Sequence, residues 1–308
     1  MSNLLFKRWN DFGGWLVFLI AAFVYGMTIE PTASFWDCPE FISCAEKLQV
    51  GHPPGAPFYM LVGNLFTQFA SEASQVSWLV NFLNALLSAG CILFLFWSIT
   101  RLVRSLIINE EQNLSTMDVI VILGSGFVGA LAYTFSDTFW FSAVEGEVYA
   151  FSSFLTALVF WMILRWQDES DSVYGDRWII LIAYIIGLSI GVHLLNLLCI
   201  PAIVLVFYYQ KYHAISFKGV AAAIVISGLL IVFILFVYIP GIADMGGWFE
   251  LLFVNVFGLP FHTGLIVFLA LTFLVLVGAI YRFRKRMLHT SLWCLLMLTV
   301  GYTTYAVI

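Results

Sequence analysis

The run V-A-A-A-I-V-I-S-G-L-L-I-V-F-I-L-F-V-Y-I, residues 220–239, decides the fold class because it contains no charged residue. A helix needs about 20 residues to cross the ~30 Å hydrocarbon core of a bilayer, and this run has that length. Lipid supplies no hydrogen-bond partner for backbone N–H and C=O groups, so a run of this kind must be helical. Several other apolar runs reach similar lengths, and the alternation typical of barrel strands is absent. The sequence therefore predicts an all-α polytopic membrane protein.

The composition of the whole chain agrees with this class. Of 308 residues, 62% are hydrophobic and 10% are charged, and the mean hydropathy is +0.98. A water-soluble surface does not permit such a composition, so membrane lipid must surround the protein. The net charge is −5 and no cluster of Lys and Arg is interleaved with aromatic residues, which excludes nucleic acid as a partner. The sequence shows no internal repeat, low-complexity tract or soluble domain, so residues 1–308 are expected to form a single transmembrane domain.

About nine spans are expected, with the run 56–70 left out of the count. That run is shorter than a span and contains Asn64, Thr67 and Gln68, so it is interpreted as a helix lying in the membrane interface within a first outer loop at 30–75. The predicted spans are 12–29, 76–100, 119–135, 148–166, 178–195, 197–209, 220–239, 265–281 and 288–308.

The distribution of charge predicts the orientation. Lys7 and Arg8 precede the first span and Glu30 follows it, which places the N-terminus in the cytoplasm. With this topology, twelve of the thirteen Lys and Arg residues lie on the inner side of the membrane, and Lys47 lies on the outer side. The outer loops at 30–75, 137–147 and 244–262 are consequently acidic. A wrong topology would hardly separate the charges so well.

Polar chemistry concentrates in S-F-W-D-C-P-E-F-I-S-C-A-E-K-L-Q-V-G-H-P-P-G-A-P, residues 34–57. Asp37, Glu40, Glu46, Lys47 and His52 all lie in this stretch, where two prolines stiffen the backbone and flanking glycines permit close approach. One interpretation is a functional site in which the two halves of the stretch face each other. The alternative is that Asp37 merely caps a helix and the rest forms a turn.

Two further polar spots fall on the predicted outer face. Glu145 and Glu147 flank a glycine, an arrangement that can hold a hard divalent cation but also occurs in ordinary solvated loops. His193 and Asn196 lie three residues apart near the outer end of a span. Polar groups at that depth usually face a cavity or a partner, although a lone histidine is often only a structural donor.

The motifs W-D-C-P-E-F (36–41) and L-Q-V-G-H-P-P-G-A-P (48–57), with A-V-E-G-E-V-Y-A (143–150) and G-V-H-L-L-N (191–196), carry a family resemblance. Together with the cytoplasmic N-terminus and the interfacial helix, they resemble the GT-C superfamily of membrane glycosyltransferases. They are most similar to the bacterial family related to the animal transmembrane protein O-mannosyltransferase that modifies receptor ectodomains. Members of that family are commonly longer, with further spans and a C-terminal soluble region.

The resemblance implies an inverting enzyme of the bacterial cytoplasmic membrane with an extracytoplasmic active site. It would move a sugar, mannose or a similar one, from a polyprenyl-phosphate donor to a Ser or Thr hydroxyl of a protein acceptor. By position, Asp37 matches the catalytic acid of the first loop and would act as general base, with Glu40 supporting it. A carboxylate in that role contributes roughly 10²–10⁴-fold.

The resemblance leaves the donor phosphate with several candidate partners. His52 would orient the loop or touch the phosphate, while Glu145 and Glu147 correspond to an acidic position that binds a metal in some superfamily members. Lys47, His52, His193 or a divalent cation would neutralise the phosphate, and the residues do not choose among them. Asn196 belongs to the same predicted substrate-binding set.

Two other function classes remain. A transporter or flippase of lipid-linked sugars should carry ionisable groups near mid-membrane, but here these groups gather at one face. A non-catalytic scaffold of an envelope complex fits the composition equally well, yet it leaves the polar stretch 34–57 unexplained.

Overall fold

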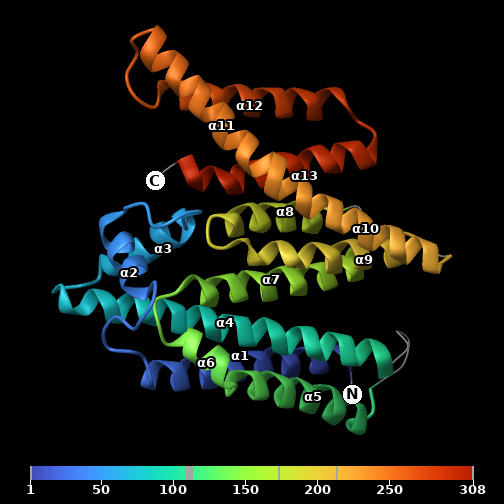
Figure 1. The fold of residues 1–308 in the computed structure, drawn as a ribbon. Coiled ribbons are helices and arrows are strands. Elements are labelled where there is room, and N and C mark those ends of the chain that lie inside the picture. Colours follow the sequence, from blue (N-terminus) through green and yellow to red (C-terminus); the bar gives the residue numbers. More distant parts are fainter. Residues whose placement is uncertain (1, 108–113, 173, 213, 307–308) are drawn as a thin grey trace. The chain divides into compact units, whose positions relative to one another are not determined.

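The computed structural model describes residues 2–107, 114–172, 174–212 and 214–306, and every regular element in these ranges is a helix (Figure 1). The predicted all-α fold of a polytopic membrane protein is confirmed. The backbone groups into two compact units, one containing residues up to Leu164 together with Ser189–Asn196, and the other containing Arg165–Leu188 and the chain from Leu197 onward. The single domain expected over 1–308 stays a prediction.

The helices of the first unit include two short ones that interrupt the series of long ones. Its elements are α1 (Asn3–Met27), α2 (Cys38–Lys47), α3 (Pro57–Thr67), α4 (Ser74–Ile107), α5 (Thr116–Thr134), α6 (Asp137–Ala143) and the greater part of α7 (Val148–Glu169). Its core is formed by α1, α4, α5 and α6, which contribute buried residues such as Val17, Tyr25, Ile92, Phe96 and Phe139. Small residues let the helices approach, because a Cβ at Gly126 would lie 2.6 Å from Thr100 Cγ2.

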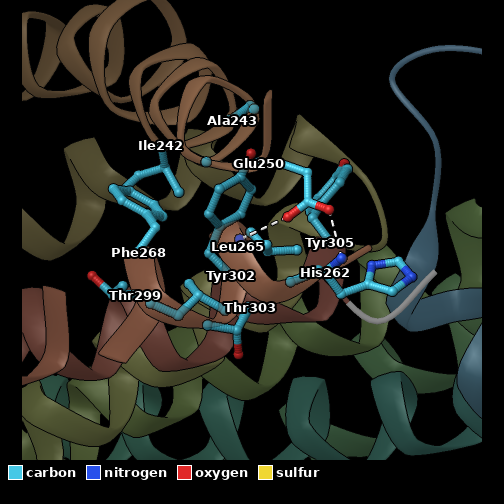
Figure 2. A pocket seen from close by; sticks show the side chains of 14 residues that line it. Ile242, Ala243, Glu250, His262, Leu265, Phe268, Thr299, Tyr302, Thr303 and Tyr305 are labelled. Atoms are coloured by element: carbon cyan, nitrogen blue, oxygen red, sulfur yellow. Dashed lines mark hydrogen bonds between the residues drawn. The ribbon is translucent and has the colours of Figure 1, made fainter. Parts of the chain in front are cut away.

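The second unit contains the C-terminal helices. Its elements are most of α8 (Asp176–Ile190), part of η1 (Leu194–Cys199), then α9 (Ile200–Lys211), α10 (Phe217–Phe233), η2 (Ile234–Tyr238), α11 (Ile239–Leu251), η3 (Leu252–Val256), α12 (Thr263–Arg282), α13 (Arg286–Tyr302) and η4 (Thr303–Ala306). A cavity of about 320 Å³ lies among α11, α12 and the chain around η4 (Figure 2).

Seven helical segments of the described chain are long and apolar enough to cross a membrane. They are Asn3–Met27, Ser74–Ile107, Thr116–Thr134, Val148–Glu169, Leu194–Lys211, Phe217–Val256 and Thr263–Arg282. The predicted count of nine is not confirmed. Two predicted spans, 178–195 and 288–308, correspond to α8 and α13, which have only 15 and 17 residues, and the last two residues of the second lie outside the described ranges.

The first part of the predicted outer loop at 244–262 is helical, and its location outside the membrane stays a prediction. One continuous helix, made of α10, η2, α11 and η3, runs from Phe217 to Val256. Its 40 residues span about 60 Å, twice the thickness of a bilayer core. Pro240 lies two residues after the π-helical turn η2, in the first turn of α11, where the regular hydrogen-bond pattern is already interrupted, so the proline does not end the helix.

The run 56–70 forms a helix of only 11 residues, α3. At 1.5 Å per residue it is about 17 Å long, too short to cross ~30 Å of hydrocarbon. Its exclusion from the spans therefore agrees with the structure. At the other end of the first unit, Arg104 Nη2 donates to Asn3 Oδ1 at 3.1 Å, and its guanidinium lies over the Phe6 ring. The start of α1, with Lys7 and Arg8, therefore lies beside the end of α4, with Arg101 and Arg104. This basic end of the first unit is away from the polar stretch 34–57.

Candidate active site

The start of α2 presents Asp37. Pro39 lies in the first turn of the helix, where its missing N–H costs nothing, and Asp37 occupies the N-cap position. The Asp37 side chain makes no capping hydrogen bond and is exposed. Trp36, immediately before it, has a left-handed backbone with φ of 64°, an uncommon conformation outside glycine. The alternative interpretation is that Asp37 only caps this helix. Its carboxylate makes no capping hydrogen bond and is therefore available for another role.

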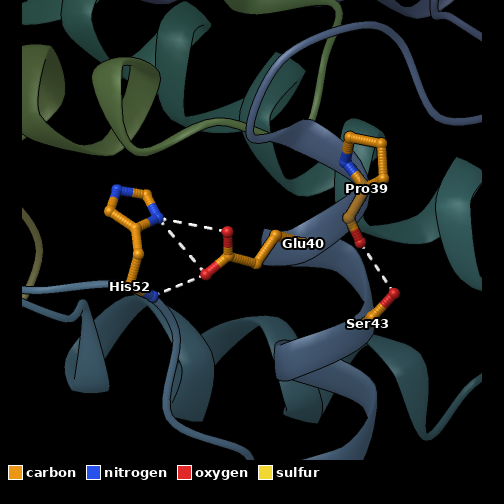
Figure 3. Close-up of polar contacts among 4 residues, drawn as sticks. All are labelled: Pro39, Glu40, Ser43 and His52. Atoms are coloured by element: carbon orange, nitrogen blue, oxygen red, sulfur yellow. Dashed lines mark hydrogen bonds and ion pairs between the residues drawn. The ribbon is translucent and has the colours of Figure 1, made fainter.

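Glu40 connects α2 to the segment 51–55. Its Oε1 accepts the backbone N–H of His52, and both carboxylate oxygens lie 3.2 Å from His52 Nδ1 (Figure 3). Gly51 permits this approach, because a Cβ there would lie 3.1 Å from Glu40 Oε1. The backbone N–H of His52, followed by its imidazole, holds the pKa of Glu40 below its ordinary value. The two halves of the polar stretch do face each other.

Asp37, Glu40 and His52 each offer an atom to a common small volume. Their candidate ligand atoms lie within 4.8 Å of one another, the one such group found among the described residues. Both oxygens of Glu40 already face the imidazole Nδ1. The set consequently fits a carboxylate–imidazole pair beside a second carboxylate better than it fits a hard divalent cation, which prefers several free oxygen ligands.

The loop holding Glu145 and Glu147 is buried beside this group. Asn84 Nδ2, in α4, donates to the backbone carbonyls of both residues, and Ser34 Oγ donates to Glu145 Oε2. Gly146 is required for packing, since a Cβ there would lie 3.0 Å from Asn81 Oδ1. Each glutamate is 6% exposed. The loop is thus a fixed part of the interior rather than a solvated turn.

Burial raises the pKa of Glu147 to about 7. Burial is the largest cause of this shift; the negative charges of Asp37 and Glu145 act in the same direction, while the N–H of Val148 and the charge of His52 act in the opposite direction. Burial also raises the pKa of Glu145, against the hydrogen bond from Ser34. The charges of Asp37 and His52 therefore act on Glu147, whose pKa lies near neutral pH.

Lys47 does not join this group. It lies in the last turn of α2, ten residues after Asp37, so the two Cα atoms are about 15 Å apart along the helix. Its side chain is exposed.

His193 and Asn196 lie in the turn and short helix that follow α8. The His193 ring packs against Tyr149, two residues beyond Glu147, with centroids 5.4 Å apart. Asn196 is fully buried, and its Oδ1 accepts from Thr156 Oγ1 at 3.1 Å. His193 therefore neighbours the acidic loop, whereas Asn196 is held inside the unit.

Two residues that hold the site together, Asn81 and Asn84, lie outside the motifs that predicted it. Asn81 donates to the carbonyls of Glu30 and Thr32, as Asn84 does for the acidic loop. The signal was present: two asparagines three residues apart share one face of an otherwise apolar helix, where polar groups are costly without partners. The hydrogen bonds that Asn81 and Asn84 donate to backbone carbonyls explain why these polar side chains lie on a buried face of α4.

A family model matches the segment that contains Asp37, Glu40 and His52. The family model described as "Protein O-mannosyl-transferase TMEM260 N-terminal domain" matches residues 37–216. The chain is 24% identical over 148 residues to "Protein O-mannosyl-transferase tmem260" of Dictyostelium discoideum, and 25% identical over 178 residues to "Protein O-mannosyl-transferase TMEM260" of Mus musculus. These matches cover 48% and 58% of this chain but only 16% and 23% of the relatives. No solved structure matches.

Proposed function

The chain belongs to the family of protein O-mannosyl-transferase TMEM260 N-terminal domains, and from this premise we propose that it carries the catalytic site of a membrane protein O-mannosyltransferase. The donor would be mannose on a polyprenyl phosphate, and the acceptor a Ser or Thr hydroxyl of a protein. The observation that carries the proposal is the exposed Asp37 carboxylate, free of a capping bond and within 4.8 Å of the Glu40–His52 pair.

In the proposed reaction, the acceptor oxygen attacks C1 of the sugar from the face opposite the phosphate. The new C1–O bond forms as the bond from C1 to the phosphate oxygen breaks, which inverts the configuration at C1. Asp37 takes the hydroxyl proton, and polyprenyl phosphate leaves with the bonding electron pair. A hydroxyl is a weak nucleophile, so this proton transfer contributes about 10²–10⁴-fold. One carboxylate suffices, whereas glycoside hydrolases place two across the scissile bond.

His52 is the proposed partner of the donor phosphate. Its Nδ1 donates to Glu40, which leaves Nε2 directed away from the pair, and Nε2 donates to the phosphate when the imidazole carries both protons (Figure 3). His52 is exposed and close to Asp37, whereas Lys47 is about 15 Å along the helix from it. Glu40 thus acts by positioning His52, and Glu145 and Glu147 form the acidic wall near the acceptor.

The proposal places this site on the extracytoplasmic face and the N-terminus in the cytoplasm. The basic end formed by α1 and α4 supports this orientation. Single cysteines introduced at exposed positions 43 and 72 should react with an impermeant maleimide applied from outside intact cells, whereas one at position 105 should not. Four of the five native cysteines are buried, which keeps the background low. Labelling at 105 and none at 43 would reverse the orientation.

The deciding experiment is a transfer assay. Membranes containing the protein are given radiolabelled polyprenyl-phosphate mannose and Ser/Thr-rich peptides, and label in the peptide fraction is counted. Transfer that depends on the protein is expected. The proposed activity would be refuted if membranes containing the protein bind the donor but transfer no label to any peptide of a broad Ser/Thr-rich set.

A further inference from the structure

The cavity of the second unit is a candidate binding site separate from the transfer chemistry. Its volume is about 320 Å³, within the range of small-molecule sites, and its walls come from α11, α12 and the C-terminal end of α13 with η4. Figure 2 shows Ile242 and Phe268 at one end of the cavity and Glu250 with His262 at the other. The cavity thus has an apolar end and a polar end.

The polar groups along the walls are already paired within the protein. Thr299 Oγ1 lies 2.9 Å from Tyr238 Oη, Tyr302 Oη donates to the carbonyl of Ile239, and Thr303 Oγ1 donates to that of Val300. A ligand needs no polar atoms to satisfy these groups. The walls therefore suit a hydrocarbon chain.

The polar end carries the carboxylate of Glu250 and the imidazole of His262. Glu250 accepts the backbone N–H groups of His262 and Leu265, which leaves further acceptor sites on its two oxygens. None of the described residues lining the cavity is Lys or Arg. A phosphate monoester at this mouth would be repelled, whereas an ammonium group would donate to Glu250.

The wall helix α11 is built to leave this space open. Gly246 and Gly247 both line it, and a Cβ at Gly247 would meet no atom within 4 Å. Glycine in a helix interior is less stable than alanine, so a pair of glycines there calls for a reason such as open space. The π-helical turns η2 and η3 bracket the same helix, and such turns are frequent at functional sites.

We propose that this cavity holds the chain of a zwitterionic membrane lipid whose headgroup amine binds Glu250. The polyprenyl-phosphate donor is not its proposed ligand, because the donor's phosphodiester would face the carboxylate of Glu250 with no Lys or Arg among the described residues beside it. The site is thus a lipid site in addition to the one that the proposed transferase activity requires.

The test uses the protein in nanodiscs that contain trace photoactivatable lipids, all with the same diazirine-bearing acyl chain. One lipid carries an ethanolamine headgroup and another a phosphate monoester; a diazirine polyprenyl phosphate forms the third arm. Crosslinked residues are mapped by mass spectrometry. We expect the ethanolamine lipid to label the α11–α13 cavity at least about fivefold more than the other two. Stronger labelling by polyprenyl phosphate, or equal labelling by all three, would overturn the proposal.

Matched variants locate the lipid. Gly247→Leu fills the cavity wall, while Gly228→Leu in α10 changes another helical glycine with open space around it that does not line the cavity. We expect Gly247→Leu alone to reduce cavity labelling about threefold or more. If Gly247→Leu does not fold, Ala243→Leu, one turn earlier in the cavity wall, replaces it. Its control is Ala222→Leu in α10, which does not line the cavity. Equal effects within a pair would refute occupancy of the cavity.

Glu250→Gln tests the headgroup. It retains one oxygen acceptor for the N–H groups of α12 but removes the charge. We expect labelling by the ethanolamine lipid to fall to the level of the phosphate lipid in a variant whose melting temperature and helix content match the wild type. An unchanged preference for the ethanolamine lipid would refute binding of the amine by Glu250.

Discussion

The backbone N–H of His52 and its imidazole Nδ1 both contact the carboxylate of Glu40, twelve residues earlier in the chain. This double contact fastens the segment after α2 against the first turn of that helix. The His52 ring also packs on Phe41, with centroids 5.8 Å apart. A single side chain, Glu40, therefore sets both the position of the segment and the direction of the imidazole.

Glu40→Ala removes both contacts at once. We expect transfer to fall about 10- to 100-fold, because hydrogen bonds to a charged group contribute about 1.5–3 kcal/mol, and we expect KM for the donor to rise. Glu40→Gln keeps an acceptor for the His52 N–H and should be intermediate. Initial rates against donor concentration provide the measurement.

Ser43→Ala is the control for this prediction. Ser43 is exposed, one turn further along α2, and donates only to the carbonyl of Pro39 (Figure 3). Its loss should leave the rates unchanged. A defect in Ser43→Ala as large as that in Glu40→Ala would show that α2 is merely sensitive to substitution.

Asn84→Leu should destabilise the protein and displace the acidic loop. It leaves the carbonyls of Glu145 and Glu147 without their donor in the interior, at a cost of about 1–3 kcal/mol for each group left unpaired. Denaturation in detergent micelles measures the loss. Ser74→Ala, exposed at the start of the same helix, should stay within about 0.5 kcal/mol of the wild type. If the two variants melt alike, the asparagine does not hold the loop.

The sequence predicts the first unit well because lipid and charge impose simple rules. A run without charges must be helical in hydrocarbon, and the short run 56–70 is correctly excluded as a span because its length forbids crossing. The pairing of Glu40 with His52 follows from prolines and glycines that bring the two halves of one stretch together. Local features of this kind are readable without tertiary information.

The second unit is harder to predict for an equally physical reason. Asp244 and Glu250 end the apolar run, but hydropathy does not show that the helix starting at Phe217 continues past them to Val256. Some features of the first unit are also hard to predict. The roles of Asn81 and Asn84 depend on which loops lie opposite α4 in the fold. Lys47 lies only ten residues after Asp37 in the sequence, but the helix between them places their Cα atoms about 15 Å apart.

Glu147 should make stability depend on pH. Its pKa in the folded protein, about 7, lies above the ordinary value of 4.5, so the folded state retains a proton that the unfolded chain releases. This contribution is fully present below pH about 4.5 and is lost as pH rises through about 7. In Glu147→Gln, the fall of melting temperature between pH 5 and 8 should be shallower than in the wild type.

Glu72→Gln is the control for the pH series, because Glu72 is exposed and outside the site. Its melting temperature should follow the wild-type slope. A wild-type slope in Glu147→Gln as well would mean that this glutamate does not hold the extra proton.

Asp37→Asn tests the proposed base against the capping role. Asparagine caps a helix about as well as aspartate, so a cap predicts a nearly silent change, and the structure gives Asp37 no capping bond to lose. A base predicts that kcat falls more than about 100-fold while donor binding is kept, because only the proton acceptor is removed. Transfer rates and donor binding are measured on the same purified preparation, with Ser43→Ala as the reference for substitutions on α2. Wild-type turnover in Asp37→Asn would remove Asp37 from the reaction and leave Glu147, the neighbouring carboxyl whose pKa is about 7, as the remaining acceptor for the proton.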